Sequence, residues 1–317
     1  MDTSNGMGNN YRKKQKMDLS IIITSFNTKD LLTTCIKSIF KFTKNINFEV
    51  IVVDNNSTDG SAEAAKALGS VIIKNKENLG FATANNQGFK ISRGKYILFL
   101  NSDTEINDNV LGEMISWMKD NTTVGVSSSA LRNKDGSMQA TGGYFPTLPR
   151  VFSWMTIQDL PFVDNIIKPF HPYHAKSFFS KGDSFYRSKK ELDWVTGAFL
   201  LCRREALEKI KGWDETFFMY VEEVDLCFRV KQMGYSIWYL PKWNITHLGG
   251  ASSKTSEFSL ISEYKGVIKF YAKHYPSWQL PILRLILKIG ALGRIILFGI
   301  LEGPSSAKIY AKAFSTV

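Results

Sequence analysis

Short apolar runs alternate with amphipathic segments along the first 130 residues of the chain. The runs are rich in β-branched residues, as buried strands are, and they cover residues 19–25, 49–54, 71–74 and 96–100. Between them, apolar positions recur at helical spacing over residues 29–44, 61–68, 82–92 and 109–119. This alternation predicts an α/β fold, with a mostly parallel central sheet and helices on both faces.

The alternation is lost between Gly142 and Asp193, where five of the nine prolines of the chain lie. Long irregular insertions in compact domains are usually functional loops. We therefore expect this segment to be irregular. We also expect it to belong to a functional site, on the side that binds an acceptor substrate. Regular structure is predicted to return as a strand over residues 194–203 and a helix over residues 221–233.

The C-terminal segment 279–303 is strongly apolar but carries four charged residues, Arg284, Lys288, Arg294 and Glu302. On a helical wheel these four share one arc of roughly 120°, which leaves the rest of the circumference apolar. No uncharged apolar run reaches the roughly 18 residues that a spanning helix needs. The pattern predicts amphipathic helices over residues 276–317 that lie on a membrane surface. The alternative is a helix packed on its own domain or on a partner chain.

Composition limits the classes of function. With 44% hydrophobic and 22% charged residues, the 317-residue chain is an ordinary globular protein. Its formal charge of +11 suits nucleic acid, an anionic membrane or a phosphorylated substrate. Three cysteines without CxxC spacing indicate reduced core thiols in a reducing compartment. Residues 1–18 are polar and basic and lack the apolar core of a signal peptide, so we expect a disordered leader.

Acidic loops follow two of the predicted strands. Asp54 ends the run 49–54, and Asn101, Ser102 and Asp103 follow the run 96–100. In an open α/β sheet, ligands bind at the carboxyl ends of the strands. Magnesium and manganese take few protein ligands and prefer hard oxygens, which makes Asp103 the first candidate ligand for a metal that neutralises a diphosphate. The two loops therefore predict a nucleotide pocket.

Eight short motifs, taken in their order and spacing, resemble glycosyltransferase family 2, and most closely its bacterial rhamnosyltransferase-like branch. They are Ile23–Asn27, Val53–Gly60, Asn78–Ala82, Leu100–Asp103, Val195–Ala198, Gly212–Glu215, Glu222–Leu226 and His247–Ser252. The resemblance runs from Leu19 to Pro276. It implies a GT-A fold and an inverting transferase, which uses one base and no covalent nucleophile.

The resemblance also implies roles for individual residues. Glu223 stands at the position of the catalytic base, where Asp is commoner. Mg2+ or Mn2+ would be held by Asp103 and His247, although Asn101 stands where the family often has a charged Asp. Acceptor-binding or supporting roles fall on Trp194, Gly197, Asp214, Glu222 and Asp225. Nucleotide-sugar binding falls on Thr24, Phe26, Asn27, Asp54, Asn56, Asn78, Gly80, Phe81, Asn85, Asn101, Ser102 and Asp103.

Taken together, the sequence predicts a basic leader (1–18), a GT-A domain (19–275) and membrane-associating amphipathic helices (276–317). Within the domain, residues 19–130 would bind the nucleotide sugar, and residues 131–275 would bind the acceptor and carry the base. The expected donor is a dTDP- or UDP-sugar, with dTDP-rhamnose first. The expected acceptor is a lipid-linked or growing glycan, met by a cytoplasmic enzyme peripheral on the inner face of the cell membrane.

Two other functions remain open from the residues. A sugar nucleotidyltransferase would share the α/β core and the acidic metal site, but would normally carry a glycine-rich, basic phosphate loop after the first strand. Residues 24–28 do not form such a loop. A nucleic-acid-binding protein would concentrate its basic residues in a stripe with interleaved aromatics. Here the basic residues are spread along the chain and at its ends.

Overall fold

The computed structural model describes residues 17–158, 160, 163–172, 182–249 and 256–317. Nearly all of the expected leader lies outside these residues. The strands are β1 (Leu19–Ser25), β2 (Phe48–Asp54), β3 (Val71–Lys74), β4 (Tyr96–Asn101), β5 (Thr104–Glu105), β6 (Val124–Arg132), β7 (Gly142–Gly143), β8 (Lys190–Leu192), β9 (Trp194–Val195), β10 (Phe199–Arg203) and β11 (Ser236–His247). The helices are α1 (Lys29–Phe42), α2 (Ser61–Ala67), α3 (Phe81–Ile91), α4 (Val110–Asp120), α5 (Leu148–Met155), α6 (Val163–Ile166), α7 (Gly182–Phe185), α8 (Arg204–Ile210), α9 (Glu222–Gln232), α10 (Ser256–His274), α11 (Gln279–Leu301) and α12 (Pro304–Thr316).

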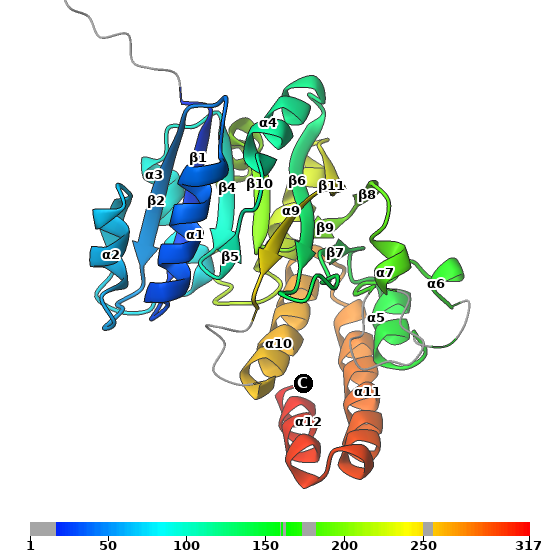
Figure 1. The fold of residues 1–317 in the computed structure, drawn as a ribbon. Helices are drawn as coiled ribbons and strands as arrows, with labels where there is room; N and C mark the ends of the chain where they lie inside the picture. The colour runs from blue at the N-terminus through cyan, green and yellow to red at the C-terminus, as the bar shows by residue number, and fades with distance from the viewer. Residues whose placement is uncertain (1–16, 159, 161–162, 173–181, 250–255) are drawn as a thin grey trace, which may run out of the picture.

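The predicted α/β architecture is confirmed. One sheet has the strand order β3-β2-β1-β4-β10-β6-β11-β5, with β8 paired to β11 (Figure 1). The pairs β3-β2, β2-β1, β1-β4 and β6-β11 are parallel, whereas β10 runs antiparallel to both β4 and β6. The sheet is therefore mostly parallel, and the four strands predicted for the first half form one side of it.

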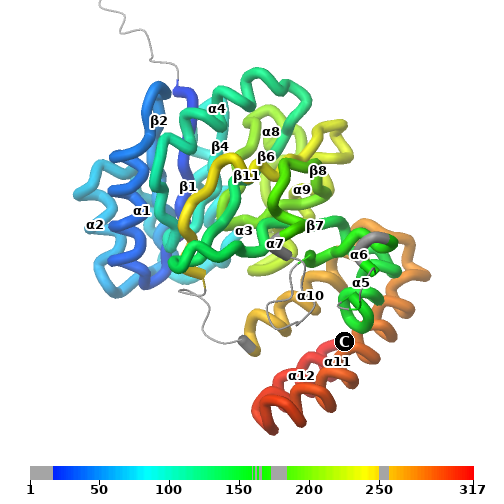
Figure 2. The backbone as a smooth tube through the Cα atoms, turned by 45° about the vertical axis from the view of Figure 1, so that its right-hand side comes forward, coloured from blue at the N-terminus to red at the C-terminus, as the bar shows by residue number. Residues whose placement is uncertain are grey.

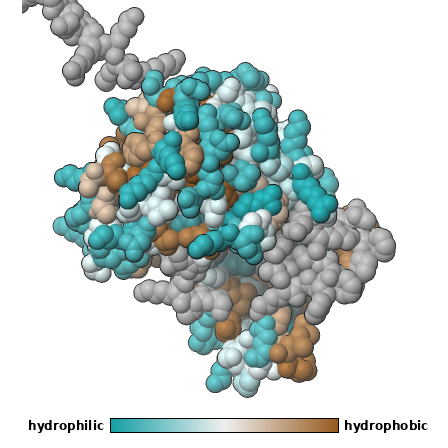
Figure 3. All heavy atoms as spheres, in the orientation of Figure 1, coloured by the Kyte–Doolittle hydropathy of each residue, from teal (hydrophilic) through white to brown (hydrophobic). Residues whose placement is uncertain are grey.

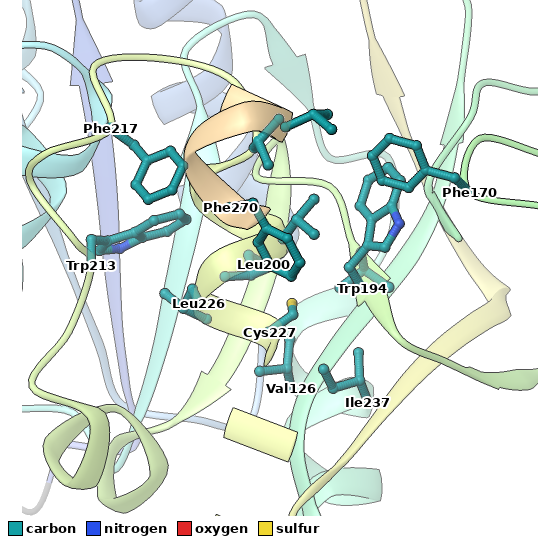
Figure 4. Packing of buried hydrophobic residues seen from close by; sticks show 14 of the residues in the cluster. Val126, Phe170, Trp194, Leu200, Trp213, Phe217, Leu226, Cys227, Ile237 and Phe270 are labelled. Carbon is teal, nitrogen blue, oxygen red and sulfur yellow. The ribbon is translucent and has the colours of Figure 1, made fainter. Parts of the chain in front are cut away.

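Side-chain alternation along the strands separates two hydrophobic cores. In β1, Ile21 and Ile23 pack with α1 and α4, while Ile22 packs in the other core with α3, α8 and α9. Because successive residues of a strand point to opposite faces, an uninterrupted apolar strand needs helices on both sides. Figure 4 shows part of the second core, where Trp213 and Phe217 lie on one side of Phe270 and Trp194 and Phe170 on the other.

The strand register brings the two acidic loops together. Ser25 at the end of β1 pairs with Asp54 in β2, and Thr24 pairs with Asn101 in β4. The last residues of three parallel strands thus meet at one edge of the sheet. On the β11 side, His247 pairs with Thr104 in β5, which brings the end of β11 to the loop that carries Asp103.

The region after Gly142 departs from the prediction in two places. The segment 142–193 was expected to be irregular, but it contains the helix α5, whose second residue is Pro149. Proline is well tolerated in a first helical turn, where its missing N–H would have no partner within the helix, so a proline count alone does not exclude a helix. The single strand expected over 194–203 is two strands, β9 and β10, interrupted at Thr196–Ala198.

The C-terminal segment forms an arm, which we define as α11 and α12. The arm projects from the sheet domain on the side where α10 lies, as both ribbon views show (Figures 1 and 2). One face of α11 packs on α5 and α12, and the buried positions include Leu283, Leu287 and Ala291. Among the described residues, no helix combines the length and the hydropathy that crossing a membrane requires.

Candidate active site

A cavity of about 290 Å³ opens at the edge of the sheet where β1, β2 and β4 end. Two walls line it, one from each half of the domain. The N-terminal wall consists of Thr24, Ser25, Phe26, Asn55, Asn78, Gly80, Phe81, Asn101, Ser102 and Asp103. The C-terminal wall consists of Thr196, Gly197, Ala198, Phe218, Met219, Tyr220, Glu222, Glu223 and His247.

Asp54 lies at the base of the N-terminal wall without lining the cavity itself. Its carboxylate is 2% exposed, and one oxygen accepts the backbone N–H of Ser57 at 3.0 Å. The other oxygen, Oδ1, is buried and has no hydrogen-bond partner among the described residues. A buried carboxylate oxygen without a donor is costly, so Asp54 is an acceptor held ready at the strand end.

Asn27 and Asn56 also lie outside the cavity, and both have left-handed backbone (φ 54° and 69°). The side-chain oxygen of Asn27 accepts the backbone N–H of Thr58 at 2.8 Å, and the backbone N–H of Asn27 donates to Ser57 Oγ at 2.9 Å. Asn27 therefore ties the loop after β1 to the loop after β2. Asn56 is exposed beside these contacts.

Gly80 joins the two walls. Its φ is +83°, and an added Cβ would lie 2.8 Å from the carbonyl oxygen of Phe218. That same carbonyl accepts the N–H of Phe81 at 3.0 Å, and Asn78 Oδ1 accepts the N–H of Gly80 at 3.0 Å. Only glycine fits here, and the backbone approach that it permits is to another part of this chain. Asn85 is buried in α3, where its amide donates to the carbonyl of Phe81.

Asp103 and His247 meet across the walls. Asp103 Oδ1 lies 3.3 Å from His247 Nε2, and Asn101 Nδ2 lies 3.4 Å from the same nitrogen. Backbone geometry supports the pair, because the N–H of Leu248 donates to the carbonyl of Asp103 at 2.9 Å. Within the described part of the chain, no group of three His, Cys, Asp or Glu side chains is arranged to hold a metal. A cation here would take one carboxylate and one imidazole from the protein and its other ligands from substrate or water, a donor set that fits Mn2+ or Mg2+.

Two adjacent residues with left-handed backbone aim the carboxylates of α9 into the cavity. Tyr220 and Val221 both have φ of +70°. For a β-branched residue this is a genuine outlier, of the kind that costs about 1–3 kcal/mol and is found at functional sites. Directly after the turn come Glu222 and Glu223, in the first turn of α9, and both line the cavity.

The environment of the two glutamates disfavours their charged forms. Burial, reinforced by the neighbouring Glu223, raises the pKa of Glu222 well above its ordinary value. Burial raises the pKa of Glu223 to about 7, although the positive charge of His171 opposes the shift. Each carboxyl has a buried Oε2 without a partner among the described residues. A carboxyl with a pKa near neutrality is suited to general-base chemistry.

Asp225 and Asp214 do not line the cavity; they connect the C-terminal wall to α10. The fully buried carboxylate of Asp225 accepts hydrogen bonds from Arg229 (2.8 Å), Lys273 (2.6 Å) and His274 (2.7 Å). Lys273 also bonds Asp214 at 2.6 Å. Burial raises the pKa of Asp225, but the three donors outweigh it, and the net pKa is lowered. Arg229 lies one helical turn after Asp225 in α9, and α10 supplies two further donors to the same carboxylate.

Trp194 and Gly197 complete the set of residues singled out in the sequence. Trp194 is 5% exposed and packs against Phe170 and His171, outside the cavity. Gly197 lines the cavity, in the break between β9 and β10, where an added Cβ would lie 3.2 Å from the ring of Phe81. The break between the two strands therefore forms part of the lining of the cavity.

Several residues of the site carried no signal in the sequence. Phe218, Met219 and Tyr220 line the cavity but belong to no periodic pattern. His171, from the segment expected to be irregular, pairs with Glu263 of α10 at 2.9 Å. The positive charge of His171 acts on Glu223 across a sequence distance that no local motif bridges.

Comparison with known proteins identifies the family of this chain. The family model described as glycosyl transferase family 2 matches residues 20–210, more than half of the chain. The chain belongs to glycosyltransferase family 2. The resemblance seen in the motifs is therefore confirmed, and so is the likeness to the rhamnosyltransferase-like branch.

Individual relatives of this glycosyltransferase are distant. The N-acetylglucosaminyl-diphospho-decaprenol L-rhamnosyltransferase of Mycobacterium tuberculosis is 24% identical over 253 residues, which cover 75% of this chain and 79% of the relative. The O-antigen biosynthesis protein RfbC of Myxococcus xanthus is 27% identical over 243 residues, 74% of this chain and 18% of that protein. Among solved structures, the mannosyltransferase PcManGT of Pyrobaculum calidifontis, in complex with GDP-Man and Mn2+, has a TM-score of 0.53 at 16% identity. The match covers 95% of this chain and 74% of that one, and it supports the GT-A fold.

Proposed function

We propose that this glycosyltransferase moves a sugar, with inversion, from a dTDP- or UDP-sugar to a hydroxyl of a lipid-linked or growing glycan in cell-surface polysaccharide synthesis. The observation that carries the proposal is that two kinds of group line one cavity. Asp103 and His247 suit a cation that holds a diphosphate. Glu223 is a carboxyl with a pKa of about 7. The cavity therefore contains groups suited to the phosphates of a donor and a group suited to the hydroxyl of an acceptor.

The N-terminal wall is the proposed nucleotide site, in the half 19–130 of the domain. The unpartnered Oδ1 of Asp54 is available to accept the ring imide proton of uracil or thymine, a proton that cytosine lacks. Thr24 and Phe26 line the cavity beside it, and the carboxamides of Asn78 and Asn101 offer further hydrogen bonds. dTDP-rhamnose is our first choice of donor, because the relative from M. tuberculosis is named as an L-rhamnosyltransferase.

Mg2+ or Mn2+ would be held by Asp103 and His247. When bound, the cation would neutralise charge on the diphosphate leaving group. Asn101 adds no charge to this site, so the protein contributes a single carboxylate. We therefore expect catalysis to depend strongly on the metal. We expect the affinity of the protein for the free cation to be weak.

Glu223 is the proposed base, in the half 131–275. Above pH 7 it is ionised and accepts the proton of the attacking hydroxyl as the new glycosidic bond forms on the face opposite the leaving diphosphate. A single displacement of this kind inverts the anomeric centre. Burial and the neighbouring Glu223 raise the pKa of Glu222, which favours its protonated form, a hydrogen-bond donor toward the same space. Asp214 and Asp225 act by holding the start of α9 through α10.

The arm is the proposed membrane contact, on the inner face of the cell membrane. Its apolar face points away from the protein: Leu285, Ile296 and Ile300 are 60%, 59% and 79% exposed. Two basic residues of α11 form hydrogen bonds with other parts of the chain. Arg294 donates to the carbonyl of Trp154 at 2.9 Å, and Arg284 donates to the carbonyl of Val317 at 2.8 Å.

Hydrophobic surface is visible at the projecting end of the molecule, where α11 and α12 lie (Figure 3). The segment 276–317 carries five Lys or Arg residues and one Glu, so its net charge suits anionic lipid. Exposed apolar residues along one face of a helix, in a segment of positive net charge, are typical of an interfacial membrane contact. A lipid-linked acceptor would be presented at that surface.

The test of the activity is nucleoside diphosphate release from dTDP-, UDP- and GDP-sugars by detergent-solubilised protein, with manganese, magnesium or chelator. Slow hydrolysis of one donor, lost with chelator and in Glu223→Gln, is expected. If no donor is used and no nucleotide shifts the melting temperature, the proposed donor site is wrong. A thermal shift without release would mean that turnover requires the acceptor.

The test of the arm is co-sedimentation with phosphatidylcholine vesicles, with and without phosphatidylglycerol. Binding is expected only with the anionic lipid, and it should be lost in the double variant Ile289→Glu/Ile296→Glu. Val71→Glu places the same charge at an apolar position of β3 that is 45% exposed, and it serves as the control. Equal binding by the double variant and the control would exclude the arm as the contact.

A further inference from the structure

The imidazole of His247 is held by Gln139, a residue that no motif singled out. Gln139 Oε1 lies 2.7 Å from His247 Nδ1, and Gln139 Nε2 lies 2.7 Å from the backbone carbonyl oxygen of His247. Gln139 therefore forms hydrogen bonds with both the ring and the main chain of His247. It lies after β6 in sequence, at the end of a turn closed by a bridge between Arg132 and Met138.

The hydrogen-bond partners of Gln139 determine which way its amide points. Besides the carbonyl of His247, its Nε2 donates to Asn133 Oδ1 at 2.5 Å. A backbone carbonyl has no proton to donate, so the amide nitrogen must face it. The amide oxygen must then face Nδ1 of His247. Because that oxygen only accepts hydrogen bonds, Nδ1 carries a proton.

The orientation of Asn133 is fixed in the same way. Its Nδ2 donates to Ser137 Oγ at 2.8 Å, and Ser137 Oγ donates to the carboxylate of Asp135 at 2.6 Å. The hydrogen bonds thus run in one direction, from His247 through Gln139, Asn133 and Ser137 to Asp135. An ionised carboxylate only accepts, so it anchors the direction of the whole chain. The Ser137 hydrogen bonds lower the pKa of Asp135, which keeps it ionised.

A proton on Nδ1 leaves Nε2 of the neutral ring with its lone pair. This nitrogen is the one that lies 3.3 Å from Asp103 Oδ1 and 3.4 Å from Asn101 Nδ2. Two acceptor atoms at that separation repel each other unless a proton or a metal cation lies between them. Histidines that ligate metals are commonly fixed by such a hydrogen bond from the other ring nitrogen.

We propose that Gln139 is a positioning residue, which sets the tautomer and orientation of His247 so that Nε2 faces Asp103 as a metal ligand. The turn 132–139 is then part of the metal site, although none of its side chains reaches the cavity. The inference rests on the proposed role of Asp103 and His247, but it makes a statement about protonation that holds without metal or substrate.

The first experiment is nitrogen NMR of the metal-free protein at pH 8. The four histidines give separate ring signals, and a His247→Asn variant identifies those of His247. The expected result is a neutral ring with the proton on Nδ1, the less favoured tautomer of free histidine. A ring protonated on Nε2 alone would overturn the inference, and this measurement needs no variant of Gln139.

The second experiment replaces Gln139 with Met, which keeps the length of the side chain and removes its hydrogen bonds. The His247 ring is expected to lose the preference for a proton on Nδ1. Binding of Mn2+, measured by electron paramagnetic resonance in the presence of dTDP and of UDP, is expected to weaken roughly 10- to 100-fold. Lys134→Ala, an exposed position of the same turn, is expected to match the wild type in both measurements.

The outcomes separate the inference from the function. If Gln139→Met keeps the wild-type tautomer and Mn2+ affinity while the wild type transfers sugar, the inference fails and the proposed function stands. If the tautomer depends on Gln139 but neither the wild type nor the variant binds Mn2+ with nucleotide, the metal role of His247 fails, and with it the inference.

Discussion

The two walls of the cavity are built in different ways. The N-terminal wall is made of residues that end or follow adjacent strands, so its geometry is inherited from the register of the sheet. The part of the C-terminal wall that carries Glu222 and Glu223 follows two left-handed residues, Tyr220 and Val221, which lie before the start of α9. It is held instead by contacts from α10, more than thirty residues further along the chain.

These contacts are specific. Gly266 of α10 leaves room for the turn: an added Cβ would lie 2.7 Å from Val221 Cγ2 and 2.9 Å from the carbonyl of Tyr220. Tyr220 hydroxyl and Ser259 hydroxyl lie 2.6 Å apart. The comparison indicates that the geometry of the proposed donor site is set by the sheet, while the orientation of the proposed base depends on α10, the helix that also leads into the arm.

The substitution expected to distinguish the two walls most strongly removes the negative charge of Glu223. Glu223→Gln is expected to lower turnover by at least about a hundredfold, because general-base catalysis typically contributes 10²–10⁴. Nucleotide affinity, which depends on the N-terminal wall, should not change. Steady-state release assays and nucleotide titration measure the two quantities, and wild-type turnover by the variant would exclude Glu223 as the base.

The same substitution should stabilise the protein at alkaline pH. A carboxyl whose pKa is raised to about 7 in the folded state favours folding when protonated, and this contribution is lost as the pH rises through 7. Gln removes the charge that burial penalises. Thermal unfolding at pH 8 should therefore give a higher melting temperature for Glu223→Gln than for the wild type, with a smaller difference at pH 5.

Asp225→Asn tests the contact between α9 and α10. The substitution leaves Arg229 and Lys273 beside a neutral group, and breaking a buried ion pair typically costs about 3–5 kcal/mol. Because the folded-state pKa of Asp225 is lowered, its contribution is present at neutral pH and is lost as the pH falls through that pKa. The difference in unfolding free energy between wild type and variant should shrink in acid. Asp120→Asn, at the exposed end of α4, is the control and should change stability little.

The first half of the fold could be predicted because each of its elements carries its own pattern. Residues 29–44 were expected to be helical, and α1 ends at Phe42. The ends of the other helices up to Asp120 differ from the expected ends by no more than one residue. The meeting of Asp54 and Asn101 also followed, since buried strands with polar carboxyl ends place those ends at one edge of a parallel sheet. The placement of these residues is thus explained by the sequence, while their roles in binding are still predictions.

The remaining features depend on contacts between distant segments. No local signal predicts left-handed backbone at Tyr220 and Val221, because the strain is tolerated only where Gly266 leaves space. The helical wheel of α11 does not show that one of its charges is used inside the protein. Arg294 donates to the backbone of α5, while an apolar face of α11 is exposed. Gln139 was missed because its partner is 108 residues away.

The pH dependence of turnover gives a smaller and graded test of the C-terminal wall. The ionised fraction of Glu223 falls about tenfold per pH unit below its pKa, so turnover should rise with pH up to about 7 and then level off. Donor affinity, measured over the same range, separates an effect on the proposed base from an effect on nucleotide binding. A flat profile of turnover between pH 5 and 8 would contradict the assignment, provided that single-turnover measurements show chemistry to be rate-limiting.

Gly266→Ala is the mildest test, and it asks whether α10 sets the position of the base. The added methyl group must displace Val221. Its Cβ is bonded directly to the backbone, so a rotation of the side chain cannot move it away. A displacement of this size is expected to lower turnover about tenfold while leaving nucleotide affinity unchanged, since misplacing a catalytic group by about 1 Å can cost up to a hundredfold. Gly293→Ala, where nothing lies within 4 Å, is the matched control in α11 and should be active and slightly more stable. If both variants bind nucleotide normally and only Gly266→Ala turns over slowly, the position of the base is set by α10. If both are fully active, the turn before α9 holds its conformation without α10, and the difference between the two walls is smaller than their construction implies.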